Sequence, residues 1–173
     1  SFFLDKHSGK KGIIIAPRDL VTSDSDNPQT WKWGRCRDSI FSETAYLTAI
    51  NQLDIRGTIG TKMLPPKREY AAYLAFKFVN GCGNNLPSAK SNIRFVNYES
   101  EIDAENQANT VHLPRLQESG GIQKMRGDGC MEVKLGYFDS KKDTDGPIEA
   151  RLFENNHFYK IGLIVEGVEF CAK

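Results

Sequence analysis

The sequence lacks any apolar run long enough to cross a membrane, because nowhere do about 18 apolar residues follow one another. The opening segment, SFFLDKHSGKKG, is too short and too charged for a secretion signal. No Asn-X-Ser/Thr glycosylation sequon occurs anywhere in the chain. We therefore expect a cytoplasmic or nuclear protein with no membrane partner.

Cysteine and histidine are also scarce. The four cysteines, Cys36, Cys82, Cys130 and Cys171, are far apart and form no CxxC pair. A zinc site needs paired ligands and a disulfide framework needs a denser set, so we expect reduced cysteines and no metal or other cofactor. The three histidines fall in no metal-spaced pair and no nucleophile motif, so no catalytic activity is expected.

An excess of charge of either sign is absent as well. The chain has 23 Lys and Arg residues against 22 Asp and Glu residues, a formal net charge of +1. Binding driven by phosphate neutralisation needs a basic excess, so nucleic acid is not an expected partner. At 173 residues the chain fits one domain with a sizeable apolar core.

The pattern that is present has a period of two. Apolar residues alternate with polar ones from Leu47 to Met63, with Leu53, Ile55 and Ile59 on the apolar side. The same alternation occurs in segment 148–152, where the apolar residues Ile148, Ala150 and Leu152 are separated by Glu149 and Arg151. In segment 131–137, one face of a strand is predicted to carry Met131, Val133, Leu135 and Tyr137. Short strands separated by turns, without a βαβ rhythm, predict an all-β fold, an antiparallel β-sandwich.

Two strands stand apart from simple alternation. The segment 69–79, EYAAYLAFKFV, is apolar on both parities, which is typical of a central strand covered on both faces. The last strand contains Gly162 and Gly167, which we interpret as candidate bulge sites. Residues 1–12 are interpreted as a lead-in, 13–173 as the domain, and about 99–127, which is polar and glycine-rich, as a long variable loop.

Five stretches together resemble the plant phloem protein 2, or Nictaba-like lectin, family. They are APRDL at 16–20, DNPQTWKW at 26–33, the run from FSETAYL to LAFKF at 41–78, GDGCMEVKLGYF at 127–138 and GPIEARLF…VEGVEF at 146–170. The opening FFLDKHSGKK is similar to the lead-in of members that carry an N-terminal F-box. The resemblance implies a jelly-roll-like sandwich similar to carbohydrate-binding modules. It also implies non-catalytic binding of N-acetylglucosamine oligomers, or of the N-glycan core on glycoproteins, without metal.

The aromatic part of the expected sugar site is drawn from Trp31, Trp33 and Tyr159. The two tryptophans are two residues apart and would share one face of a strand, where they could form a platform for the apolar face of a pyranose. The resemblance matches Trp31 to a binding-site tryptophan and Tyr159 to a late tryptophan of the family. This chain departs from the family's tryptophans at three further positions, Asp24, Gln52 and Cys130.

The acidic part is drawn from Glu154 and Glu149. The resemblance matches Glu154 to a family carboxylate that binds sugar hydroxyls, and a carboxylate can accept two such bonds. The second family carboxylate falls at Pro147, and Glu149, two residues on, is the candidate to replace it. A glycosidase would also use two carboxylates, but five residues apart on one strand they would face opposite sides.

One alternative function stays open beside the lectin. The domain could be a protein-interaction module whose sugar groove has been lost, serving as a substrate receptor of a ubiquitin ligase if an F-box lies upstream. Because edge strands of sandwiches can pair between copies, a homodimer is one expected assembly.

Overall fold

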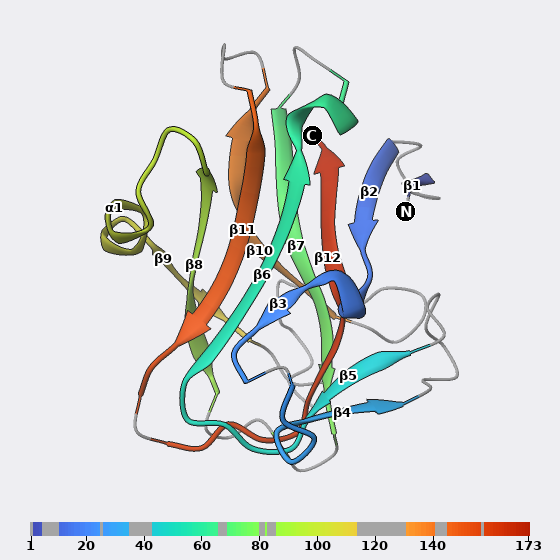
Figure 1. The fold of residues 1–173 in the computed structure, drawn as a ribbon, viewed down its shortest axis with the longest axis vertical. Coiled ribbons are helices and arrows are strands. Elements are labelled where there is room, and N and C mark those ends of the chain that lie inside the picture. Colours follow the sequence, from blue (N-terminus) through green and yellow to red (C-terminus); the bar gives the residue numbers. More distant parts are fainter. Residues whose placement is uncertain are drawn as a thin grey trace.

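The computed structural model confirms the predicted antiparallel β-sandwich: two sheets lie face to face around one apolar core (Figure 1). The residues it describes are 2–4, 11–24, 26–34, 43–65, 69–79, 82, 86–113, 131–140, 145–156 and 158–173. Among these residues, the structure has no helix that could cross a lipid bilayer.

The first sheet is organised around its last strand. It contains β1 (Phe2–Leu4), β2 (Lys11–Ile15), β4 (Trp31–Gly34), β5 (Thr44–Leu47), β7 (Glu69–Phe78), β10 (Met131–Asp139) and β12 (Leu163–Ala172). β12 pairs with β7 along its whole length, and on its other side with β2 and β5. β10 pairs with β7, which therefore lies between two strands, as the apolar run at 69–79 predicted.

The second sheet has the order β3-β6-β11-β8-β9. Its strands are β3 (Val21–Thr22), β6 (Leu53–Gly60), β8 (Ser88–Phe95), β9 (Asn109–His112) and β11 (Pro147–Glu154). Two short 3₁₀ turns, Pro17–Asp19 and Thr61–Met63, precede β3 and follow β6. Helix α1 (Glu101–Asn106) lies between β8 and β9, and Ser100 caps it by accepting the Asp103 N–H at 3.1 Å.

The predicted alternation correctly places most of the core. Ile148, Ala150 and Leu152 on β11 are fully buried, and β6 buries Leu53, Ile55 and Ile59. Met63 was predicted to continue this apolar side but is exposed, because β6 ends at Gly60 and Met63 lies in the 3₁₀ turn.

A bulge overturns the predicted face of β10. The pairing with β7 shifts register between Lys134 and Gly136, so the alternation changes parity there. Tyr137 is therefore exposed, and Phe138 is buried and stacks on Tyr70 with ring centroids 5.5 Å apart.

The two glycines predicted as bulges in the last strand have different outcomes. Gly167 lies at a register shift in the pairing of β12 with β7, so that prediction is confirmed. Gly162 precedes β12 instead, with a φ of +77°, and its N–H donates to the Leu47 carbonyl at 2.9 Å. It serves a turn that joins the end of β5 to the start of β12.

The long loop predicted at about 99–127 differs from the structure in its first part. Residues 101–106 form α1 and 109–112 form β9, while 114–130 lie outside the described residues. Neither element has an apolar pattern that would predict it from the sequence, because α1 is exposed on most of its surface and β9 is an edge strand. Within the expected lead-in, Phe2–Leu4 pairs with β2.

Candidate functional site

Trp31 is part of the core rather than a platform for a ligand. Its side chain is 2% exposed and belongs to the apolar cluster between the sheets. The indole Nε1 donates a hydrogen bond of 2.8 Å to the backbone carbonyl of Ser23, which satisfies its one polar atom. Stacking on a sugar needs an open ring face, so the predicted role of Trp31 is corrected to a structural one.

Trp33 lies on the same strand, β4, and is half-buried. The Arg18 guanidinium covers its ring, with the guanidinium carbon 3.8 Å from the centroid. Arg18 is itself held by Glu43, whose Oε2 accepts from the Arg18 Nε at 2.9 Å. This ring face is therefore occupied by a neighbouring side chain, and Trp33 does not extend a platform with Trp31.

Glu149 is taken up by a cluster of ion pairs on the outer face of the second sheet. Its Oε1 accepts from the Arg94 Nε at 3.1 Å and lies 3.7 Å from a nitrogen of Arg56. Glu149 is buried, so it offers no open acceptor for a sugar hydroxyl. Glu149 also has the opposite parity on β11 from Glu154, so the two carboxylates face opposite sides of the strand, which argues against a catalytic carboxylate pair.

The same cluster, here called the arginine network, extends across three strands. Asp54 on β6 accepts two hydrogen bonds from Arg151 on β11, at 2.9 and 2.8 Å, and two from Arg56, at 3.2 and 2.9 Å. Helix α1 adds Glu101, which pairs with Arg56, and Glu105, which accepts from Arg151 at 2.5 Å. Bidentate pairs of this kind fix side-chain geometry strongly.

The neighbouring arginines determine the pKa values of the carboxyl groups in this network. Burial alone would raise the pKa of Asp54, but the hydrogen bonds and charges of Arg151 and Arg56 outweigh it, and the pKa of Asp54 is lowered. The hydrogen bond from Arg56 likewise lowers the pKa of Glu101. The network is therefore ionised at neutral pH and stabilises the sheet rather than serving as an acid or base.

Glu154 is the last residue of β11, and Tyr159 lies in the loop that follows, between β11 and β12. The Glu154 Oε1 accepts from the backbone N–H groups of Asn155 and Asn156 at 2.9 and 3.0 Å, so it closes the first turn of this loop. Tyr159 is 62% exposed and its neighbour Phe158 is 65% exposed. With Ile161, which is also exposed, they form what we call the aromatic loop surface (Phe158, Tyr159 and Ile161).

A buried lysine fixes this loop from beneath. Lys160 is fully buried and its ammonium donates to the carbonyls of Asn51 and Asn156, the latter at 3.1 Å. Its backbone also pairs with Ile50 in both directions, at 2.7 and 3.1 Å. Burial lowers the pKa of Lys160, and the nearby charge of Glu154 opposes that shift. The 154–162 loop is thus attached to the segment before β6, at the lower end of the sandwich in Figure 1.

The five predicted site residues therefore do not form one pocket. Glu154 and Tyr159 belong to one short segment of the chain, whereas Trp31, Trp33 and Glu149 have structural partners. Sequence reasoning missed Phe158, although an aromatic residue two positions after the polar Asn155-Asn156 pair was a signal for an exposed ring. Across the described part of the chain, no group of three or more His, Cys, Asp or Glu side chains is placed to hold a metal ion.

The phloem protein 2 family model matches residues 10–172, almost the whole chain. The chain belongs to the phloem protein 2 family. Two relatives of this phloem protein 2 domain come from Arabidopsis thaliana. F-box protein VBF is 29% identical over 196 residues, covering 99% of this chain and 70% of that protein. F-box protein PP2-B13 is 30% identical over 198 residues, covering 97% of this chain and 68% of that protein.

The fold also has a counterpart among solved structures. The GH26-CBM35 β-(1,4)-mannanase of Podospora anserina superposes with a TM-score of 0.51 and 10% sequence identity, over 94% of this chain and 28% of that enzyme. At this identity the similarity shows that the phloem protein 2 domain shares a β-sandwich fold with that protein, and nothing about its ligand.

Proposed function

We propose that this phloem protein 2 domain is a non-catalytic recognition domain that binds a partner protein through the aromatic loop surface. The observation that carries the proposal is that two adjacent aromatic side chains, Phe158 and Tyr159, are 65% and 62% exposed on a loop anchored by the buried Lys160. Exposed aromatic groups on a fixed backbone are typical of interface anchors, because little conformational freedom is lost on binding.

The relatives support a more specific role for this surface. Both Arabidopsis proteins are F-box proteins, and this domain matches about two thirds of their length. We propose that the domain is the substrate-recognition part of such a protein and delivers its partner to a ubiquitin ligase. The cytoplasm and nucleus, where ubiquitin ligases act, are the proposed locations.

Affinity purification with matched variants tests this proposal. The wild-type chain, a Phe158→Ser/Tyr159→Ser variant and an Ile102→Ser control are used as baits in plant extracts. Ile102 is 71% exposed on α1, so its replacement removes a comparable apolar side chain from a different surface. We expect the same partner to bind wild type and the control but not the double variant, and the purified partner to reproduce this in direct titration. Equal binding by all three baits would refute the role of the aromatic loop surface.

A second candidate is recognition of N-acetylglucosamine-containing glycans by the same loop. It is supported by the common location of Glu154 and Tyr159, two of the residues predicted for sugar binding, with the ring of Tyr159 accessible for stacking. A glycan array with the wild-type chain and Tyr159→Ala tests it. Soluble N-acetylglucosamine oligomers added to the affinity purification separate the two candidates, because they displace a glycoprotein partner only if its glycan is bound.

A further inference from the structure

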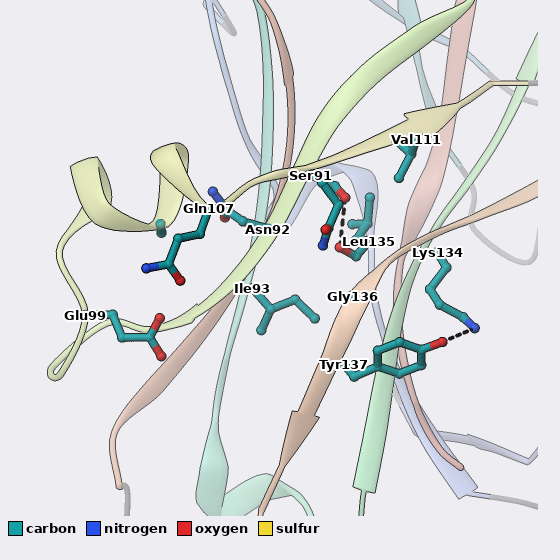
Figure 2. Close-up of a pocket in the computed structure, with 12 residues that line it drawn as sticks. Ser91, Asn92, Ile93, Glu99, Gln107, Val111, Lys134, Leu135, Gly136 and Tyr137 are labelled. Carbon is teal, nitrogen blue, oxygen red and sulfur yellow. Dashed lines mark hydrogen bonds between the residues drawn. The ribbon is translucent and has the colours of Figure 1, made fainter.

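Two lysine ammonium groups contact one exposed tyrosine, Tyr137, on the outer face of the first sheet. The Lys134 Nζ donates to the Tyr137 hydroxyl oxygen at 2.8 Å and lies 4.6 Å from the ring centroid (Figure 2). The Lys173 Nζ lies over the same ring, 3.6 Å from its centroid. Tyr137 is 53% exposed, so this group of three residues, here called the Tyr137 site, is open to solvent.

A β-bulge brings two of these side chains together. Lys134 and Tyr137 are three positions apart, and in a regular strand they would face opposite sides of the sheet. The register of β10 with β7 shifts between Lys134 and Gly136, so both side chains point outward and both are exposed. Bulges of this kind often redirect a side chain beside a functional site.

The third residue, Lys173, comes from the other side of β7. It follows β12, and its backbone N–H donates to the carbonyl of Glu69, at the start of β7, at 2.9 Å. Its side chain reaches Tyr137 across β7, where Ala71 pairs with Tyr137 and presents only a methyl group. The Tyr137 site is therefore built on the paired strands of a sheet, which hold its three residues in place.

Within the described residues, the positive charges of the Tyr137 site have no acidic partner. Neither ammonium group forms an ion pair there, whereas Lys77 on β7 pairs with Glu166 at 3.6 Å. The Tyr137 hydroxyl accepts from Lys134, so its own hydrogen has no acceptor in this part of the chain. The hydrogen bond and charge of Lys134, together with the charge of Lys173, lower the pKa of Tyr137. The site therefore presents two ammonium groups and a hydroxyl as donors to solvent.

A phosphate group matches this set of donors. At neutral pH a phosphorylated side chain carries a charge of about −1.5 to −2 and three acceptor oxygens, more than a glutamate carboxylate offers. Glu132 and Asp139 lie on the same face of β10, one on each side of the site in sequence, and would repel a polyanion such as nucleic acid. The surroundings therefore favour a single phosphate group over a chain of them.

We propose that the Tyr137 site binds a phosphoserine or phosphothreonine side chain of a partner polypeptide. The phosphate would accept from the Lys134 and Lys173 ammonium groups and from the Tyr137 hydroxyl. The partner's backbone would lie over Tyr73, which is directly opposite Lys134 in the pairing with β7 and has its ring 6.0 Å from the Lys134 Nζ. This contact gives a phosphopeptide an advantage over free phosphate.

The Tyr137 site is separate from the aromatic loop surface. Lys173 follows the end of β12, whereas the 154–162 loop precedes its start, and the 10 residues of this strand span roughly 30 Å. The inference therefore does not rest on the function proposed above.

Titration of the isotopically labelled chain with the peptide acetyl-Gly-phosphoserine-Gly-amide, followed by two-dimensional NMR, tests the proposal. We expect saturable shifts at the amides of 134–137, Tyr73 and Lys173. Acetyl-Gly-Glu-Gly-amide should bind at least about tenfold more weakly, because its carboxylate has less charge and fewer acceptor oxygens. Inorganic phosphate should bind about threefold more weakly than the phosphopeptide. Equal binding of the phosphopeptide and either of these probes, or shifts confined to another surface, would overturn the proposal.

Variants of the two lysines test the role of their charges. The double variant Lys134→Gln/Lys173→Gln should weaken binding of the phosphopeptide at least about tenfold, whereas Lys134→Arg, which keeps the charge, should bind within about threefold of wild type. Lys32→Gln, which removes an exposed lysine from β4, is the control and should bind as wild type. Unchanged binding by the double variant, or an equal loss in the control, would refute the site.

Two further variants separate the site from other effects. Tyr137→Phe removes only the hydroxyl and should weaken the phosphopeptide about threefold, with urea denaturation showing wild-type stability because the side chain is exposed. Phe158→Ser/Tyr159→Ser should retain full affinity for the phosphopeptide. Loss of the phosphopeptide in this loop variant would place the binding on the aromatic loop surface and overturn the assignment to Tyr137, whereas failure of the Tyr137 site leaves the function proposed for the loop untouched.

Discussion

The indole nitrogen of Trp31 and the backbone carbonyl of Ser23 form a 2.8 Å hydrogen bond inside the sandwich. The bond ties the start of β4 to the turn after β3, and so connects the two sheets at one end of the molecule. Ser23 also uses its hydroxyl in this turn, donating to the Gln52 carbonyl at 2.9 Å and accepting the Asp54 N–H at 3.1 Å. Trp31 is therefore packed over a turn that is itself well ordered by hydrogen bonds.

Replacing Trp31 should consequently affect stability before it affects binding. We expect Trp31→Ala to lower the free energy of unfolding by about 3–5 kcal/mol, through a cavity in the core and an unpaired carbonyl. Tyr159→Ala, on the exposed loop, should change it by no more than about 0.5 kcal/mol. Urea denaturation followed by circular dichroism measures both. A well-folded Trp31→Ala protein of wild-type stability would show that the indole is not a core residue.

Asp54 joins Arg56 and Arg151 through four hydrogen bonds, so its removal leaves a buried guanidinium without its main partner. We expect Asp54→Asn to lower the free energy of unfolding by about 3 kcal/mol at pH 7, near the lower bound for breaking a buried ion pair. Asp103→Asn, on the exposed side of α1, is the control and should be close to wild type.

The same substitution should also change the pH dependence of stability. Because the pKa of Asp54 is lowered in the folded protein, its contribution is complete above the unfolded carboxyl pKa of about 4 and is lost as the pH falls through the folded value. The wild-type protein should therefore lose stability on acidification below about pH 4. Asp54→Asn should decline less steeply over this range in denaturation curves. Parallel declines would mean that Asp54 does not titrate with folding.

The β-sandwich could be predicted from the sequence because alternation of apolar residues survives wherever a strand has one buried face. Ile148, Ala150 and Leu152 show this, since β11 pairs on both sides without a register shift. The prediction failed for Tyr137, where a bulge after Lys134 changes parity. A bulge depends on how two strands pair, and a pattern within a single strand does not contain that information.

The candidate site was harder to predict for a related reason. Trp31 and Glu149 were chosen because an aromatic ring or a carboxylate can contact sugar, but the same side chains can equally satisfy structural partners. Which occurs depends on residues distant in sequence, such as Ser23 for Trp31 and Arg94 for Glu149. Glu154 and Tyr159 belong to the same short segment of the chain, at the end of β11 and in the loop after it, and placing them there requires no long-range prediction.

Gly167 should be one of the least replaceable residues of the sheet. Its φ is +146°, which side chains rarely adopt, and a Cβ built there would lie 2.7 Å from the Ile15 carbonyl oxygen. We expect Gly167→Ala to cost at least about 2 kcal/mol of unfolding free energy, through backbone strain and displacement of β2. Gly60→Ala is the control, since a Cβ there has no neighbour within 4 Å. Thermal unfolding that shifts equally for both would contradict the bulge geometry.

Lys160 provides the test of how the aromatic loop surface is supported. Lys160→Met keeps the length of the side chain but leaves the carbonyls of Asn51 and Asn156 without their donor, so we expect a loss of about 1–3 kcal/mol. Amide hydrogen exchange should increase in the 154–162 loop. Lys62→Met, at an exposed position, should change neither quantity.

The alkaline range separates this anchoring role of Lys160 from simple packing. Because burial lowers the pKa of Lys160, the unfolded chain binds more protons than the folded one between the folded pKa and about pH 10.4. The contribution of Lys160 therefore makes the wild-type protein more stable as the pH rises through this window. Lys160→Met should lack that contribution, and Lys62→Met should retain it. If denaturation curves of all three proteins followed the same pH dependence, the Lys160 ammonium would not be buried as the structure places it, and the loop would need another anchor.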